Sequence, residues 1–166
     1  MRALSYFIVA VLLLAVQSTF GVLLQIGAVK PDFILTLVLC VALIRGENGG
    51  ALYGLAIGLL EDIVYGNFLG FNALVKFLTG YAVGYGTRDL FKGPVVFTMG
   101  FVFVGTLLYN FIFLAACWVF IPGYTSSLFL QKVVSSALYN ALLGPFMYAA
   151  VVKLERFLNY YFETKY

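Results

Sequence analysis

The segment GENGGALYGLAIGLLEDIVYG, residues 46–66, decides how the chain folds. Its glycines recur at every fourth position, at Gly46, Gly50, Gly54 and Gly58, and Asp62 occupies the next step of the same register. On an α-helix, residues four apart lie on one face, so these positions form a single ridge. So many glycines would weaken a helix in water, whereas in a membrane small residues let two helix backbones approach closely. The ridge therefore predicts a tightly packed pair of transmembrane helices.

The composition of the whole chain also indicates a membrane protein. Of its 166 residues, 63% are hydrophobic and only 10% are charged, and the mean hydropathy is +1.02. These values lie far from those of soluble domains. The net charge is +3, but the basic residues stand at the ends of apolar runs rather than in one patch, so nucleic acid is not expected as a partner.

Six apolar runs predict six transmembrane helices, at residues 3–29, 33–44, 49–65, 71–86, 95–121 and 133–152. The first run is longer than the roughly 7–15 apolar residues of a secretory signal, so it is predicted to be a retained span. The second run is shorter than the roughly 20 residues that a bilayer needs, which predicts that the Pro31-Asp32 turn dips into the outer leaflet or that the bilayer thins there. No connection is long enough to bury a core of its own, so residues 1–166 are predicted to form one all-α membrane domain.

The Lys and Arg residues predict the orientation of these spans. With the N-terminus inside, the cytoplasmic side carries Arg2, Arg45, Arg88, Lys92, Lys153, Arg156 and Lys165. The outer side carries only Lys30 and Lys132. Because cytoplasmic loops of membrane proteins are enriched in Lys and Arg, both termini are predicted to be cytoplasmic.

The fourth run carries the pattern of the third in reverse, in the series Lys76, Gly80, Gly84 and Arg88. If the turn at residues 66–70 is the tip of a hairpin, the facing pairs are Gly58 with Gly80, Gly54 with Gly84, and Asp62 with Lys76. An unpaired charge in a membrane helix costs ~2.5–3.5 kcal/mol, which favours an ion pair between Asp62 and Lys76. Two alternatives stay open. Glu61, Asp62 and Lys76 snorkel to the outer interface, or the pair, or Asp62 alone, lines a cleft for a substrate or a partner helix.

Residue types used in catalysis are scarce. The chain has no His and only two cysteines, Cys40 and Cys117, both within apolar runs. These counts exclude a Ser-His pair, a His metal site and a zinc site. Glu61 and Asp62 are neighbours, so on a helix they point about 100° apart and do not face each other as acid and base. The sequence predicts no enzyme activity, no metal and no cofactor.

Other polar residues in the apolar runs are predicted to have structural roles. Asn110 in the fifth run, and Ser135, Ser136 and Asn140 in the sixth, are expected to form hydrogen bonds between helices. Pro145 is expected to kink the sixth helix.

The segment from Lys30 to Arg88 resembles the rod shape-determining protein MreD family. The shared elements are Pro31-Asp32, Ala-Leu-x-Arg-Gly with Arg45, the glycines Gly50, Gly54 and Gly58 before Asp62, Leu69-Gly70, Gly80-Tyr81 with Gly84, and Arg88. Their order and spacing, rather than any single element, carry the resemblance.

The resemblance implies a non-enzymatic scaffold in the bacterial cytoplasmic membrane. Such proteins belong to the elongation machinery that directs lateral peptidoglycan synthesis, together with the bitopic MreC, the filament MreB, the polymerase RodA and its transpeptidase partner. By analogy, the membrane anchor helix of MreC would dock on this chain, and membrane lipid would surround both. The glycine ridges offer a surface for such docking if they do not pack on each other.

Two other functions stay open. The resemblance also implies the six-helix fold of the substrate-binding subunits of energy-coupling-factor vitamin transporters. As such a subunit, the chain would coordinate a small solute with Asp62, Lys76 and Asn110. The first helix of those subunits carries an Ala-x-x-x-Ala face, and Ala3, Ala10 and Ala15 do not make that spacing here. A lipid-binding or lipid-translocating protein would need a polar groove open to the bilayer.

Overall fold

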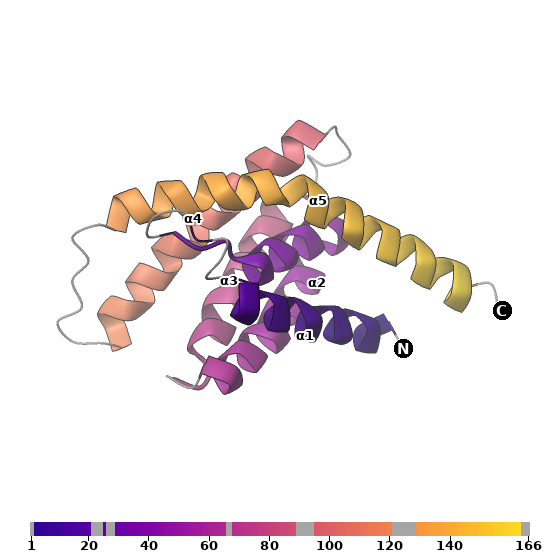
Figure 1. The fold of residues 1–166 in the computed structure, drawn as a ribbon, viewed down its shortest axis with the longest axis horizontal. Coiled ribbons are helices and arrows are strands. Elements are labelled where there is room, and N and C mark those ends of the chain that lie inside the picture. Colours follow the sequence, from indigo (N-terminus) through magenta and orange to yellow (C-terminus); the bar gives the residue numbers. More distant parts are fainter. Residues whose placement is uncertain are drawn as a thin grey trace.

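A computed structural model of the chain is all-α and describes residues 2–20, 25, 29–65, 68–88, 95–120 and 129–163. Its five helices are α1 (Arg2–Phe20), α2 (Phe33–Tyr65), α3 (Phe71–Gly86), α4 (Val95–Phe120) and α5 (Phe129–Glu163) (Figure 1). Several predicted features lie outside the described residues. They are the span ends at residues 21–24, 26–28 and 121, the turn residues 66–67, and the cations Lys92 and Lys165.

The structure has five described helices rather than the predicted six spans, because the second and third apolar runs follow each other as α2 with only the non-helical Gly46 between them. No loop separates them. Within α2 only Gly46 departs from helical geometry, with φ 73° and ψ −167°. A positive φ costs glycine little, so the chain reverses at this one residue. The two parts, here called the first arm (33–45) and the second arm (47–65), lie against each other: a Cβ added at Gly50 would lie 2.5 Å from the Cβ of Ala42.

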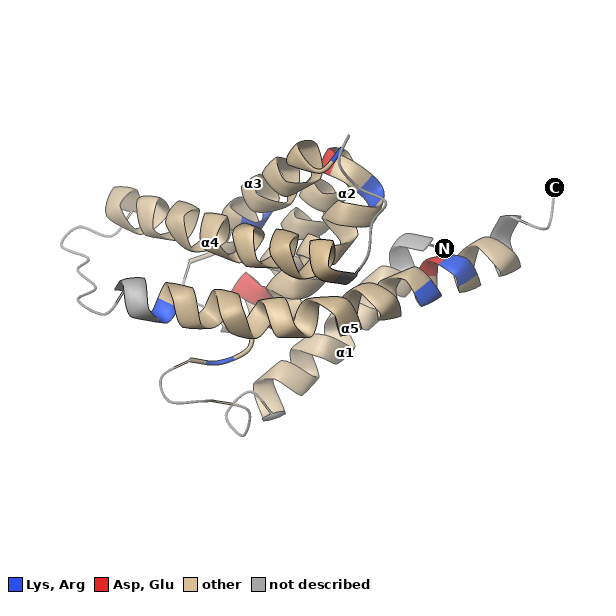
Figure 2. Cartoon of the chain, turned by 90° about the horizontal axis from the view of Figure 1, so that it is seen from above, with Lys and Arg blue, Asp and Glu red and all other residues tan. Residues whose placement is uncertain are grey.

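Three segments of the described chain are long and apolar enough to cross a membrane: Phe33–Tyr65, Val96–Phe120 and Lys132–Tyr160. A shorter apolar helix covers Ser5–Thr19. Charged residues, blue and red in Figure 2, are few, and α4 carries none of them. The expectation of an all-α membrane protein is therefore confirmed at this level.

The first arm is the centre of the structure. Every residue from Ile34 to Leu43 is buried. Its neighbours include α4, where a Cβ added at Gly105 would lie 2.7 Å from Leu39, and α5, where the carbonyl of Gly144 accepts a 3.7 Å hydrogen bond from the Cys40 thiol. A helix that is apolar on all sides is stable when other helices surround it. This surrounding explains why so short an apolar run forms a helix at all.

The second arm packs on α3 in an antiparallel pair, and small residues let the two backbones touch. A Cβ at Gly50 would lie 2.6 Å from the carbonyl oxygen of Gly80, and one at Gly58 would lie 2.5 Å from the Cα of Ala73. The other members of this glycine seam are Gly54, which faces the carbonyl of Lys76, and Gly84, which faces the backbone of Gly46 and Glu47. Each such contact leaves no room for a side chain.

The predicted register of this pair is wrong by about two helical turns. Gly80 faces Gly50 rather than Gly58, and Gly84 faces the Gly46 turn rather than Gly54. The prediction assumed that the connection between the helices is symmetrical about residue 69. Instead, the first turn of α3 lies beside Asp62, whose carboxylate accepts the backbone N–H of Ala73. Residues further along α3 therefore meet the second arm closer to its start.

Helices α4 and α5 form the other wall. The predicted interhelical hydrogen bonds are present at Asn140, whose Nδ2 donates to the hydroxyl of Thr106 at 3.4 Å, and at Asn110, whose Nδ2 donates to the hydroxyl of Ser136 at 3.5 Å. The long helix α5 includes Pro145 and bends near its middle (Figure 1). Proline lacks the N–H that would continue the helical ladder, which accounts for the bend.

The seam generates a testable expectation. We expect Gly54→Ala to lower the free energy of unfolding by about 1–3 kcal/mol, the usual cost of overpacking, because its new Cβ meets the backbone of α3. The measurement is denaturation in mixed detergent micelles. Gly100→Ala is the matched control, since a Cβ there meets nothing within 4 Å and alanine favours the helix. Equal destabilisation by both changes would contradict backbone contact at the seam.

Candidate functional site

A buried ion pair joins the second arm to α3. Lys76 Nζ lies 2.5 Å from Glu61 Oε2, and Lys76 is only 1% exposed. The ammonium also lies 5.0 Å from the centroid of the Tyr109 ring on α4, within the range of a cation–π contact. Because desolvating both charges is expensive, this pair holds together only while its geometry and its surrounding contacts are kept.

Asp62 does not pair with Lys76, which corrects the predicted ion pair. Its carboxylate instead accepts hydrogen bonds at the beginning of α3. The donors are the backbone N–H groups of Gly70 (2.9 Å), Asn72 (3.1 Å) and Ala73 (3.2 Å) and the Asn72 side chain (2.9 Å). The first N–H groups of a helix lack partners within the helix, and the helix dipole favours a negative charge there. The preceding helix thus supplies the cap of α3.

The different roles of Glu61 and Asp62 follow from helix geometry. Neighbouring side chains point about 100° apart. Asp62 continues the glycine ridge and therefore meets the first turn of α3, while Glu61 points aside to Lys76. Sequence reasoning selected Asp62 because of the ridge and missed Glu61 and Tyr109. The only feature of the sequence that pointed to Glu61 as a site residue was its position next to Asp62.

The Pro31-Asp32 element begins the first arm. Asp32 Oδ1 accepts the N–H of Leu35 at 2.8 Å, which is an N-cap, and the N–H of Asp32 donates to Asn140 Oδ1 on α5 at 3.0 Å. The start of the first arm is therefore capped by its own Asp32 side chain and tied to α5.

The opposite end of the bundle carries the arginines. Arg45 Nε lies 2.5 Å from Glu155 Oε1 on α5, and its guanidinium lies 4.5 Å from the centroid of the Tyr6 ring on α1. Arg88 Nη1 is 3.5 Å from Glu47 Oε1. We call this the basic end. The resemblance pointed to Arg45 and Arg88 from sequence, whereas Glu155, the partner of Arg45, gave no signal.

The remaining residues of the shared pattern lie on or near the surface of α3. Gly70 has φ 94° and precedes the first turn of the helix, a conformation that L side chains rarely adopt. Tyr81 is exposed and stacks on Tyr85, with ring centroids 6.3 Å apart. No contact of either residue in the described structure joins them to the buried ion pair.

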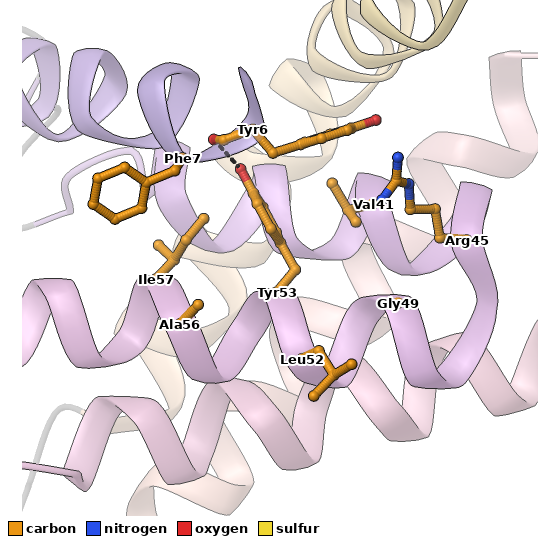
Figure 3. A pocket seen from close by; sticks show the side chains of 9 residues that line it. All are labelled: Tyr6, Phe7, Val41, Arg45, Gly49, Leu52, Tyr53, Ala56 and Ile57. Atoms are coloured by element: carbon orange, nitrogen blue, oxygen red, sulfur yellow. Dashed lines mark hydrogen bonds between the residues drawn. The ribbon is translucent and has the colours of Figure 1, made fainter. Parts of the chain in front are cut away.

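An apolar groove of about 550 Å³ lies between α1 and the two arms of α2 (Figure 3). We call it the α1 groove; its lining residues are Tyr6, Phe7, Val41, Arg45, Gly49, Leu52, Tyr53, Ala56 and Ile57. Tyr53 closes one wall, because its hydroxyl donates to the carbonyl of Tyr6 at 3.0 Å. Phe7 and Leu52 are exposed beside it, at 45% and 65%. The groove is accessible, unlike the seam.

These contacts define the class of the protein. The fold is a helical membrane protein, and its buried charges hydrogen-bond to one another or to helix ends. Within the described residues, no group of three or more Cys, Asp or Glu side chains is placed to hold a metal ion. The arrangement of Glu61, Asp62 and Lys76 therefore supports a structural role.

A family model described as rod shape-determining protein MreD matches residues 1–158. The chain belongs to this family and has a role in rod shape determination as a protein of the inner membrane. The resemblance seen over residues 30–88 is thus confirmed over nearly the whole chain. No curated protein and no solved structure matches the chain. The expected likeness to the fold of vitamin-transporter subunits accordingly has no support from solved structures.

The ion pair can be tested by a double-mutant cycle. We expect Glu61→Gln and Lys76→Met each to lower the free energy of unfolding by about 3–5 kcal/mol, because each leaves a buried charge without its partner. The double variant should lose much less than the sum. Unfolding in mixed micelles measures all four forms.

The control cycle combines Lys76→Met with Asp62→Asn. Because Asp62 bonds to the start of α3 rather than to Lys76, these two losses should be closer to additive. A larger coupling energy for Asp62 than for Glu61 would contradict the observed pairing.

Proposed function

We propose that this protein is a non-enzymatic scaffold of the cell-elongation machinery, which binds the membrane anchor helix of an MreC-like bitopic protein and so supports lateral peptidoglycan synthesis. The observation that carries the proposal is the family match over residues 1–158. Contacts with MreB, RodA and its transpeptidase partner are direct or pass through that bitopic protein. Residues 1–166 act as one membrane domain.

The α1 groove, rather than the glycine seam, is the proposed docking surface. All five seam glycines contact backbone of the α2–α3 pair, which leaves a partner helix no access to them. The α1 groove exposes apolar side chains and includes the exposed small residue Ala56. Small residues on an exposed helix face let a second helix approach closely in a membrane.

Both termini are proposed to lie in the cytoplasm. Arg45, Arg88 and Arg156 come from three parts of the chain and gather at the basic end. Lys132 stands at the other end of α5 from Arg156. Because α2 reverses at Gly46, the start of its first arm and the end of its second arm lie on the same side of the membrane, opposite the Gly46 turn. This distribution supports a cytoplasmic basic end.

The vitamin-transport alternative would require Asp62, Lys76 and Asn110 to meet a solute. Each of these side chains already bonds within the chain: Asp62 to the start of α3, Lys76 to Glu61, and Asn110 Nδ2 to the carbonyl of Thr106 at 2.7 Å. The scaffold is therefore the function that we propose.

Co-purification tests the docking surface. We expect the MreC-like protein of the same cell to be recovered with the tagged wild-type chain, and Leu52→Trp to reduce the recovery several-fold, because the indole fills the groove. Leu142→Trp on α5 is the matched control, since Leu142 is 60% exposed and lies outside the groove lining. Failure to recover any MreC-like protein with the wild-type chain would contradict the scaffold role. Equal loss with both variants would contradict the α1 groove.

The orientation can be tested by cysteine labelling. We expect a membrane-impermeant maleimide to label Lys132→Cys in intact cells, and to label Lys153→Cys only after the membrane is opened. The wild-type chain is the control, because Cys40 and Cys117 are 0% and 1% exposed. The reverse pattern would place the basic end outside the cell.

A further inference from the structure

A second pocket, of about 600 Å³, lies at the basic end between the Gly46 turn, the end of α3 and the C-terminal half of α5. None of its lining residues belongs to the α1 groove. Its walls are of two kinds. Leu43, Ile44 and Val152 are apolar and at least partly buried, whereas Arg88, Arg156 and Asn159 are exposed and polar. The volume is in the range of sites that hold small organic ligands.

The two arginines of this pocket differ from Arg45 in their contacts. Arg45 is held by Glu155 at 2.5 Å. Arg88 has only the 3.5 Å contact with Glu47, and its side chain is 65% exposed, so this pair is weak and easily exchanged. Arg156 forms no ion pair with any described residue. Two guanidinium groups are therefore available at one pocket.

The ionisable side chains that line this pocket leave a surplus of one positive charge. Arg88 and Arg156 stand against the single carboxylate of Glu155. A ligand with one negative charge neutralises this surplus. Guanidinium groups bind phosphate oxygens through two parallel N–H···O bonds. Two such groups therefore favour a phosphodiester over an uncharged sugar or an apolar chain.

We propose that this pocket binds the phosphodiester of an anionic membrane phospholipid, with the phosphate between Arg88 and Arg156 and the glyceryl end of the acyl chains against Leu43, Ile44 and Val152. Anionic lipids gather at basic segments beside a membrane span. The assignment to the cytoplasmic leaflet rests on the orientation proposed above, whereas the phosphate chemistry does not. The site is independent of the binding of any partner helix.

Native mass spectrometry of the full-length protein in detergent tests the site. The probes are phosphatidylglycerol, the zwitterionic phosphatidylcholine, and glycerol 3-phosphate as a phosphate without acyl chains. We expect phosphatidylglycerol to be retained in preference to phosphatidylcholine. Arg156→Gln should reduce its retained fraction about tenfold, the effect of losing one charge-assisted hydrogen bond. The fraction of phosphatidylglycerol retained by Arg156→Lys should lie between those of the wild type and Arg156→Gln, because lysine keeps the charge and loses the bidentate geometry.

Lys153→Gln is the matched control, because Lys153 is an exposed cation three residues from Arg156 and does not line this pocket. It should leave retention within about twofold, as expected for a surface charge without a direct contact. Equal loss in Lys153→Gln and Arg156→Gln would show a general attraction to the basic end and overturn the site. Equal retention of the two lipids would overturn the preference for an anionic ligand.

The remaining outcomes separate the sources of the phosphate. Displacement of phosphatidylglycerol by an equal concentration of glycerol 3-phosphate would overturn the lipid as ligand in favour of a soluble phosphate. Thermal denaturation of each variant shows whether it is folded. Arg88→Gln offers an independent second variant on α3, and unchanged retention in folded Arg88→Gln and Arg156→Gln would overturn the proposal.

Discussion

The rest of the structure depends on the backbone contact between the second arm of α2 and α3. Gly50, Gly54 and Gly58 place helix backbone against helix backbone, and Gly80 and Gly84 do the same from the other side. In a membrane no hydrophobic force drives two helices together, so close packing and polar contacts must supply the stability of the pair. The absence of Cβ atoms along this line makes that packing possible.

The register of the seam decides the chemistry at its ends. With Gly58 against Ala73, the Asp62 carboxylate reaches the free N–H groups at the start of α3, and Glu61 is left to face Lys76. At the other end, Gly84 touches the Gly46 turn and brings α3 to the basic end, where Arg88 approaches Glu47. Buried charges in such a setting are tolerable because each has a partner. The membrane-facing surface is left for other contacts, among them the α1 groove.

Much of the candidate site could be inferred from the chain, though its pairing could not. The glycine ridge, the acidic and basic residues within the apolar runs, and the basic residues at one end were all visible in the order of residues. The family match agrees with the role in rod shape determination that the resemblance implied. Glu155 and Tyr109 gave no sequence signal, because their importance comes from what they touch: Arg45 in one case and Lys76 in the other. The α1 groove gave none either, since it forms where α1 crosses two arms that are distant from it in sequence.

The sequence by itself determined that the chain is helical and belongs in a membrane, and that its third and fourth apolar runs pack closely. Composition and the period of the glycines are local properties, and they act in the same way whatever the rest of the chain does. Only the tertiary structure decided that Gly46 joins two runs into α2, that Gly80 meets Gly50, and that Lys76 pairs with Glu61. These pairings depend on the geometry of the connection between α2 and α3, and on the Asp62 carboxylate that caps the start of α3 across that connection. A shift of one helical turn in the register changes every residue pair along the seam. The free energy of that shift is set by tertiary contacts, which cannot be inferred from the order of residues.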